Sequence, residues 1–272
     1  MPQVQTSDGV KLHWEERGSG PTVVMIAHWS LHPVLWEPIT AELERDHRVV
    51  RYDDRGTGQS ERVGPYNLET GTADLEAVLE AACEGPVVTM GVMDGPNKAV
   101  RLAARRPDLI SHVVSPGGAP LGRRVLGGTD AMIASNTVVG AFMQQLETDY
   151  RGAVRALVEA ANPNMPQDEV RSRVAGQVEH VPLEAAGPRV REWAEDEAAE
   201  HASREIGDRL TVLLSDGATG GWFPDVHVLE PVLREHFPEA VIEILEDGII
   251  SRPDLTAAVI RERTTTDVES TA

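Results

Sequence analysis

The chain is poor in the residues that build disulfides, thiolate metal centres and basic surfaces. Cys83 is the single cysteine in 272 residues, so neither an internal disulfide nor a cysteine-based zinc site can form. Lys11 and Lys98 are the only lysines, and 44 acidic residues against 25 basic ones give a formal charge of −19. Because such a field repels phosphate and anionic lipid, the sequence predicts no nucleic acid and no membrane as a partner.

Long apolar runs and paired metal ligands are absent as well. No apolar run reaches the length that crosses a bilayer, and residues 1–10 do not read as a charged-then-apolar leader. We therefore expect a soluble, cytoplasmic protein. His28 and His32 are four residues apart, but they lie in a proline-flanked loop with no helix to align them. The sequence predicts neither a metal nor a cofactor, and it leaves a homodimer open.

What the chain does contain is an alternation of strand and helix patterns. Apolar or alternating runs predict strands at residues 10–16, 22–27, 48–52, 86–90, 109–114, 210–214 and 241–245. Amphipathic segments between most of them predict helices, and residues 119–208 are helical in pattern, with breaks expected at residues 162–164 and 187–188. We expect a mostly parallel sheet flanked by helices, with a helical insert over the carboxyl ends of the strands.

The segment at residues 86–100 joins one of these strands to a helix through a tight turn. Its turn reads Gly-Val-Met-Asp-Gly, with Gly91 and Gly95 on either side of Met93. A strand, a Gly-x-Nu-x-Gly turn and a helix make the nucleophile elbow, in which the central residue attacks the substrate. Met93 has no proton to lose and no useful nucleophilicity toward a carbonyl carbon. The spacing thus predicts the elbow without its nucleophile.

A second motif supports a resemblance that covers residues 9–106 and resumes at 210–263. The loop after the third predicted strand reads Tyr-Asp-Asp-Arg-Gly-Thr-Gly-Gln-Ser at residues 52–60. With the elbow, it resembles the α/β-hydrolase fold of epoxide hydrolases, esterases and haloperoxidases. That resemblance implies a core at residues 1–118 and 209–264 and a lid at 119–208, inserted after the sixth strand. Residues 265–272 are expected to form a flexible tail.

The same resemblance implies a catalytic triad whose three positions can be checked. The nucleophile position is Met93, and the acid is expected near residues 218–220, which are Ala, Thr and Gly. The histidine is expected near Ile249, but the last histidine of the chain is His236. Cys83 is no substitute nucleophile, because it lies at the end of a helix and before the strand. The sequence therefore predicts a degenerate triad and excludes Ser-His-Asp hydrolysis.

Two ionisable residues near the elbow are the candidates for catalysis. Asp94 follows the nucleophile position, where a desolvated carboxylate suits acid or base chemistry, although an Asp before a helix also caps it. His28 replaces a glycine in a loop that faces the pocket in relatives, and it either exchanges protons near neutral pH or faces solvent. By resemblance, the main-chain N–H groups of Trp29 and Asp94 form the oxyanion hole.

A further set of residues is predicted to contact a substrate. Asp54 and Asp216 follow predicted strands at the edge where the pocket is expected, and aromatic residues are candidates for a wall around an apolar ligand. The predicted substrate-binding residues are Trp29, Met93, Asp54, Asp216, Trp222 and Phe142.

These residues lead to one favoured function and two alternatives. An apolar cavity with one or two ionisable groups suits a non-hydrolytic, cofactor-independent cyclase, isomerase or lyase that acts on a small metabolite, for which bacterial secondary metabolism is the natural setting. The first alternative is a catalytically dead pseudo-hydrolase that binds a small ligand or a protein partner. The second is a hydrolase that uses Asp94 in place of the usual nucleophile.

Overall fold

The computed structural model describes residues 2–26, 28–29, 36–118, 120, 140–161, 165–193, 195–216, 225–245 and 252–270. These residues form one eight-stranded sheet in the order β1-β2-β4-β3-β5-β6-β7-β8. The strands are β1 (Gln3–Gln5), β2 (Lys11–Arg17), β3 (Thr22–Met25), β4 (Arg48–Tyr52), β5 (Val87–Met90), β6 (Ile110–Pro116), β7 (Leu210–Ser215) and β8 (Val241–Leu245). Among the described strands, β2 pairs antiparallel with both β1 and β4 and every other pair is parallel, so the sheet is mostly parallel, as predicted.

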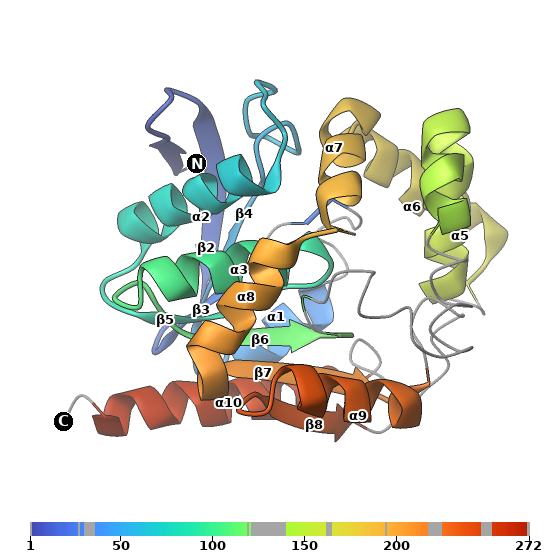
Figure 1. The fold of residues 1–272 in the computed structure, drawn as a ribbon. Helices are drawn as coiled ribbons and strands as arrows, with labels where there is room; N and C mark the ends of the chain where they lie inside the picture. The colour runs from blue at the N-terminus through green and yellow to red at the C-terminus, as the bar shows by residue number, and fades with distance from the viewer. Residues whose placement is uncertain are drawn as a thin grey trace.

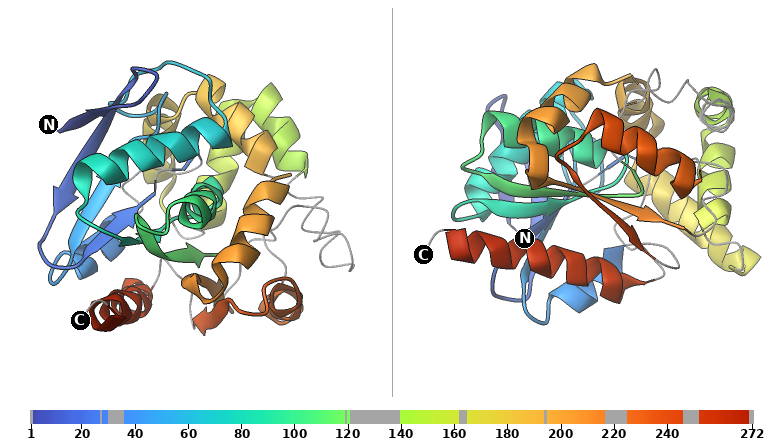
Figure 2. Two further views of the ribbon diagram at one scale, coloured as in Figure 1. Left: turned by 60° about the vertical axis from the view of Figure 1, so that its left-hand side comes forward. Right: turned by 60° about the horizontal axis from the view of Figure 1, so that its bottom comes forward.

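Helices cover both faces of the sheet (Figures 1 and 2). The helices described are α1 (Glu37–Leu43), α2 (Leu68–Ala82), α3 (Asp94–Arg105), α5 (Tyr150–Ala161), α6 (Gln167–His180), α7 (Leu183–Trp193), α8 (Glu197–Ile206), α9 (Val226–His236) and α10 (Pro253–Ser270). Residues 140–148 are helical too. Together these elements form the α/β-hydrolase fold. None of the helices described is both long and apolar enough to cross a membrane.

Each face of the sheet has its own apolar core. On one face, side chains of α2, α3, α8 and α9 pack on the sheet around Leu75, Val100 and Leu233. On the other, α1 and α10 pack on the strands around Ile39, Val88 and Ile260. Figure 2 (right) shows α1 and α10 together on the side of the sheet opposite α2 and α3. The central strand β5 lies between the two cores, and this arrangement fixes the turn that follows it.

The helices between β6 and β7 lie where the predicted insert belongs, with one exception in packing. In Figure 1 the arrowheads of β6 and β8 point toward the side of the molecule that holds α5, α6 and α7. In contrast, α8 packs along α3, and its Ala199 and Ile206 join the core of the sheet. The division into a core and a lid at residues 119–208 stays a prediction, and α8 lies with the core layer.

The C-terminal end of the chain differs from the prediction. The sequence predicts a helix that ends near Arg263 and a flexible tail at residues 265–272. In the structure α10 continues from Pro253 to Ser270, so the predicted tail is helical up to that residue. The polar composition of residues 264–270 misled the prediction, because a helix that already has a packed first half extends at little cost.

Candidate functional site

The elbow predicted from the glycine spacing is present between β5 and α3. Met93 has φ 55° and ψ −115°, and it is the one non-glycine residue with positive φ in the part of the chain that the structure describes. A Cβ added at Gly91 would lie 3.2 Å from both the Cα of Gly95 and the Cβ of Ile26. Glycine is therefore needed where strand and helix approach so closely. The strained backbone of a nucleophile elbow is retained, and its apex is a methionine.

Asp94, the first residue of α3, is completely buried beside this apex. Its Oδ1 atom accepts a hydrogen bond of 3.1 Å from the main-chain N–H of Trp29. The N-cap of α3 is Met93, with no capping side chain, so the alternative in which Asp94 caps the helix is wrong. One of the two main-chain donors of the predicted oxyanion hole is thus occupied by the protein's own carboxylate.

Lys98 connects Asp94 to a second buried carboxylate. The Nζ atom of Lys98 lies 2.7 Å from Oδ2 of Asp54 and 3.4 Å from Oδ2 of Asp94. All three side chains are almost fully buried. A Cβ at Gly71 in α2 would lie 2.9 Å from Cδ of Lys98, so the glycine makes room for the lysine. The predicted residues Asp54 and Asp94 are therefore brought together by a lysine that the sequence analysis did not select.

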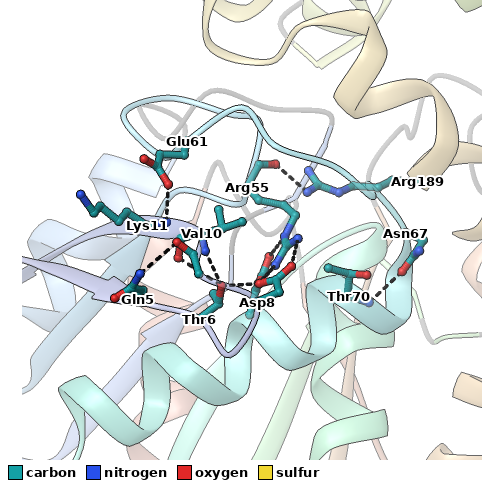
Figure 3. A network of polar contacts seen from close by, with 12 residues as sticks. Gln5, Thr6, Asp8, Val10, Lys11, Arg55, Glu61, Asn67, Thr70 and Arg189 are labelled. Atoms are coloured by element: carbon teal, nitrogen blue, oxygen red, sulfur yellow. Dashed lines mark hydrogen bonds and ion pairs between the residues drawn. The ribbon is translucent and has the colours of Figure 1, made fainter.

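Arg189 of α7 completes the group, which we call the inner cluster (Asp54, Asp94, Lys98 and Arg189). Its Nη1 atom lies 3.5 Å from Oδ2 of Asp54, and its Nη2 atom donates to the carbonyl oxygen of Arg55 at 2.8 Å (Figure 3). Several buried atoms of the inner cluster have no hydrogen-bond partner among the described residues: Oδ1 of Asp54, Oδ2 of Asp94, and Nε and Nη1 of Arg189. The inner cluster contains opposite charges that pair with one another, and it has unpaired donors and acceptors that could bind a ligand.

Burial and these charges set the protonation of the residues around the cluster. Burial raises the pKa of Asp94, and Asp54 adds to the effect while Lys98 opposes it. Burial also acts to raise the pKa of Asp54, but Lys98 and Arg189 together hold it below its ordinary value. The pKa of the buried His28 is lowered to about 3, first by burial and then by the charge of Lys98. His28 is therefore neutral near pH 7, unlike the titrating imidazole that the sequence suggested.

A second charged cluster lies directly beside the first and has a different character. The guanidinium of Arg55 binds Asp74 of α2 through Nε (2.7 Å) and Nη2 (2.6 Å), and it binds Asp8 through Nη1 (2.8 Å) and Nη2 (3.0 Å). We call this group the Arg55 clamp (Asp8, Arg55 and Asp74). Figure 3 shows it between the turn that carries Asp8 and helix α2. It ties the N-terminal hairpin to the helix layer and thereby supports the loop that carries Asp54.

Apolar side chains cover the elbow. Trp29, Phe142 and Leu146 are buried in one cluster with residues of α5 and α7, and Met93 packs against it. The ring of Trp29 lies 5.9 Å from that of Phe142 and 6.2 Å from that of Trp193. The predicted residues Trp29, Met93 and Phe142 are therefore brought together beside Asp94.

The remaining predictions have other outcomes. Asp216 follows β7 and is exposed, and no described contact places its carboxylate at the elbow. Trp222 and the expected triad positions at residues 218–220 and 249 lie outside the described residues. Within the described ranges, no group of three or more His, Cys, Asp or Glu side chains is arranged to hold a metal ion.

The sequence analysis missed Lys98, Arg189 and Tyr52. Tyr52 ends β4, and its hydroxyl is buried with no described partner; burial, and then Asp54, Asp74 and Asp94, raise its pKa well above the ordinary value. Lys98 carried a readable signal, because it lies four residues after Asp94 on a helix and is one of two lysines in the chain. Arg189 carried none, since nothing in its helix links it to Asp54.

Comparisons with known proteins agree with the fold. No family model matches the chain. An esterase from Exiguobacterium antarcticum superposes with a TM-score of 0.78 at 17% identity, covering 97% of this chain and 98% of the other. The pimeloyl-[acyl-carrier protein] methyl ester esterase of Aliivibrio salmonicida is 28% identical over 163 residues, which are 58% of this chain and 59% of that protein.

A third relative is the 2-(acetamidomethylene)succinate hydrolase of Mesorhizobium japonicum, 27% identical over 60% of this chain and 57% of its own length. The chain shares the α/β-hydrolase fold with the solved esterase structure. It spans somewhat more than half the length of these two curated relatives.

The names of the relatives correct the predicted function. They are esterases and hydrolases, which points to hydrolysis, so the prediction of a non-hydrolytic cyclase, isomerase or lyase is wrong. The prediction took the absence of a serine at the elbow as the absence of the reaction. Hydrolysis requires a water molecule and a base, and a covalent intermediate is one of several routes to it.

Proposed function

We propose that this protein hydrolyses a small carbonyl compound, an ester or a related acyl derivative, by direct attack of water with Asp94 as the general base. The observation that carries the proposal is the position of Asp94: buried at the elbow, held through Oδ1 by the N–H of Trp29, with Oδ2 free of hydrogen bonds among the described residues. The esterase and hydrolase names of the curated relatives support the reaction class.

Water as the nucleophile follows from the residues that the usual mechanism would use. A thioether such as that of Met93 does not attack a carbonyl carbon to form an acyl-enzyme. We also propose that the acid and histidine positions are replaced, because residues 218–220 are Ala, Thr and Gly and no histidine follows His236. With no nucleophile at the apex and no histidine after β8 to activate one, the proposed base acts on water itself.

The proposed step balances at named atoms. Oδ2 of Asp94 takes a proton from water while the water oxygen bonds to the carbonyl carbon and the carbonyl oxygen becomes an oxyanion. When the tetrahedral intermediate collapses, the bond to the leaving oxygen breaks, and the proton on Asp94 passes to that oxygen. The raised pKa of Asp94 makes it a stronger base than an ordinary aspartate, and Lys98 at 3.4 Å favours its ionised form. The N–H of Asp94 lies at the N-terminus of α3, where the helix dipole favours negative charge.

The apolar cover over the elbow suits an apolar acyl group. Met93, Trp29 and Phe142 provide a low-dielectric surround in which the base and the oxyanion donors act more strongly than in water. The proposal therefore concerns an ester or lactone with a hydrocarbon acyl chain.

The test is a panel of p-nitrophenyl esters, methyl esters and lactones with acyl chains of increasing length, followed with the wild type and with Asp94→Asn. We expect steady turnover without a burst, and a loss of at least about 100-fold in kcat/KM in the variant. Asp108→Asn is the matched control, because Asp108 is an exposed carboxylate paired with Arg106 just before β6, at the opposite end of the sheet. Absence of wild-type turnover across the panel, or equal rates in Asp94→Asn, would overturn the proposal.

A further inference from the structure

Trp29 carries a buried hydrogen-bond donor that the fold does not use. The residue is 2% exposed, and its indole Nε1–H has no hydrogen-bond partner among the described residues. A buried tryptophan N–H usually finds an acceptor, since leaving such a group unpaired costs about 1–3 kcal/mol. A donor in this condition is most simply explained by an acceptor that arrives with a ligand.

Among the described residues, no acceptor is hydrogen-bonded to the indole N–H, and apolar side chains pack around the ring. The cluster that buries Trp29 consists of aliphatic and aromatic side chains, with the rings of Phe142 and Trp193 at 5.9 Å and 6.2 Å. Met93, at the apex of the elbow, packs against the same cluster. The unpaired N–H therefore lies among apolar side chains next to the apex of the elbow.

The two donors of Trp29 are in different states. Its main-chain N–H is engaged by Oδ1 of Asp94 at 3.1 Å, and this bond also fixes the backbone that carries the indole. Its side-chain N–H donates a hydrogen bond to none of the described residues. The main-chain N–H, which the resemblance assigned to the oxyanion hole, is thus already hydrogen-bonded. The indole N–H of the same residue is the second donor.

We infer that the indole N–H of Trp29 is the donor that binds the carbonyl oxygen of the substrate, in place of its main-chain N–H. The inference rests on the proposed function for the reaction and adds a recognition rule: the ligand carries a carbonyl oxygen on an apolar group. As negative charge develops on that oxygen, the hydrogen bond strengthens, because the surrounding side chains exclude water.

The test observes the indole directly in full-length protein labelled with nitrogen-15 at its five tryptophans. The probes are methyl pentyl ketone, which cannot be hydrolysed, and its alkene isostere, in which C=CH₂ replaces C=O. Trp29→Phe identifies the Trp29 resonance by its disappearance. Trp36→Phe is the matched control, since Trp36 is equally buried but belongs to the core on the α1 and α10 side of the sheet.

We expect the ketone to move the Trp29 indole proton downfield and the alkene to leave it in place. Trp29→Phe should bind the ketone about tenfold more weakly and the alkene as before, which is the loss of one buried hydrogen bond. Equal shifts with both probes, or a ketone-specific shift at another indole, would overturn the inference. If Trp29→Phe does not fold, elimination of the other four indoles by single Trp→Phe variants assigns the resonance, and the wild-type comparison still decides.

Kinetics separate this inference from the proposed function. If esters are hydrolysed, Trp29→Phe should lower kcat/KM by about 100-fold, as removal of an oxyanion donor does. Hydrolysis without a ketone-specific shift contradicts the role of the indole and leaves Asp94 as the base. A ketone-specific shift without hydrolysis of any ester contradicts the proposed function and leaves the carbonyl site.

Discussion

Asp54 and Arg55 are neighbours in the sequence and both are buried, yet their side chains belong to two charged clusters of different character. In the Arg55 clamp, three nitrogens of the guanidinium donate to the two oxygens of Asp74 and the two of Asp8. In the inner cluster, Asp54, Asp94 and Arg189 each keep at least one polar atom without a hydrogen bond among the described residues. A cluster whose polar atoms are all hydrogen-bonded stabilises the fold, and one that keeps unpaired polar atoms has donors and acceptors left for a ligand.

The largest effect on stability is expected when the Arg55 clamp is broken. Arg55→Met leaves the fully buried Asp74 without its cation, and removal of one partner of such a pair costs about 3–5 kcal/mol of unfolding free energy. Urea denaturation measures the loss. Arg105→Met is the matched control, because Arg105 pairs with Glu69 on the surface and its removal should cost less than about 1 kcal/mol. Equal losses in the two variants would show that the clamp is not structural.

A smaller effect is expected from His28, which the charge of Lys98 in the inner cluster helps to keep neutral. The pKa of His28 is lowered from 6.5 to about 3 in the folded protein, so between these values only the unfolded chain binds the proton. Folding stability therefore falls as pH drops below 6.5, with a slope of up to about 1.4 kcal/mol per pH unit from this residue. His28→Leu should flatten the stability curve over that range. An unchanged slope would mean that His28 titrates normally.

Lys98 of the inner cluster should control how the activity depends on pH. Asp94 acts as a base when ionised, so kcat/KM rises with pH through its raised pKa. The charge of Lys98 lowers the pKa of Asp94, and Lys98→Met removes that charge. The acid limb of the pH profile of kcat/KM should therefore move to higher pH by about one unit. Asp54→Asn should move it the other way. Lys11→Met, at the exposed and only other lysine, is the control, and a limb that stays in place in Lys98→Met would contradict the assignment.

The smallest effect is expected at Tyr52, whose buried hydroxyl has no described hydrogen-bond partner. Tyr52→Phe leaves no other group unpaired, so the unfolding free energy should change by less than about 0.5 kcal/mol. Thermal unfolding of the variant beside the wild type measures this. A loss above about 1 kcal/mol would show that the hydroxyl belongs to a closed network like that of the Arg55 clamp.

The fold could be predicted from the sequence because its signals are local. The glycines at 91 and 95 are needed where strand and helix approach, and apolar runs mark strands that the sheet buries on both faces. Met93 and Asp94 could be placed at the turn for the same reason, since the elbow motif fixes their positions, whereas Trp29 was placed by resemblance.

The inner cluster could be predicted only in part. Arg189 meets Asp54 across 135 positions of chain, and no periodicity links them. The sequence also does not show that Oδ1 of Asp94 takes the N–H of Trp29, because that bond depends on how the loop after β3 approaches α3. The function was misjudged because the missing nucleophile was taken as the absence of hydrolysis. Asp94 was predicted as an acid or a base, but its contact with Lys98 was not.

The measurement that tests the central claim most directly is a single turnover in heavy-oxygen water, with the best ester of the panel and mass spectrometry of both product and protein. Direct attack of water predicts one heavy oxygen in the released acid, none in the peptide that carries Asp94, and a reaction at least about 100-fold slower in Asp94→Asn. A heavy oxygen in the Asp94 carboxylate, or an acyl group on any residue of the wild type, would contradict the account.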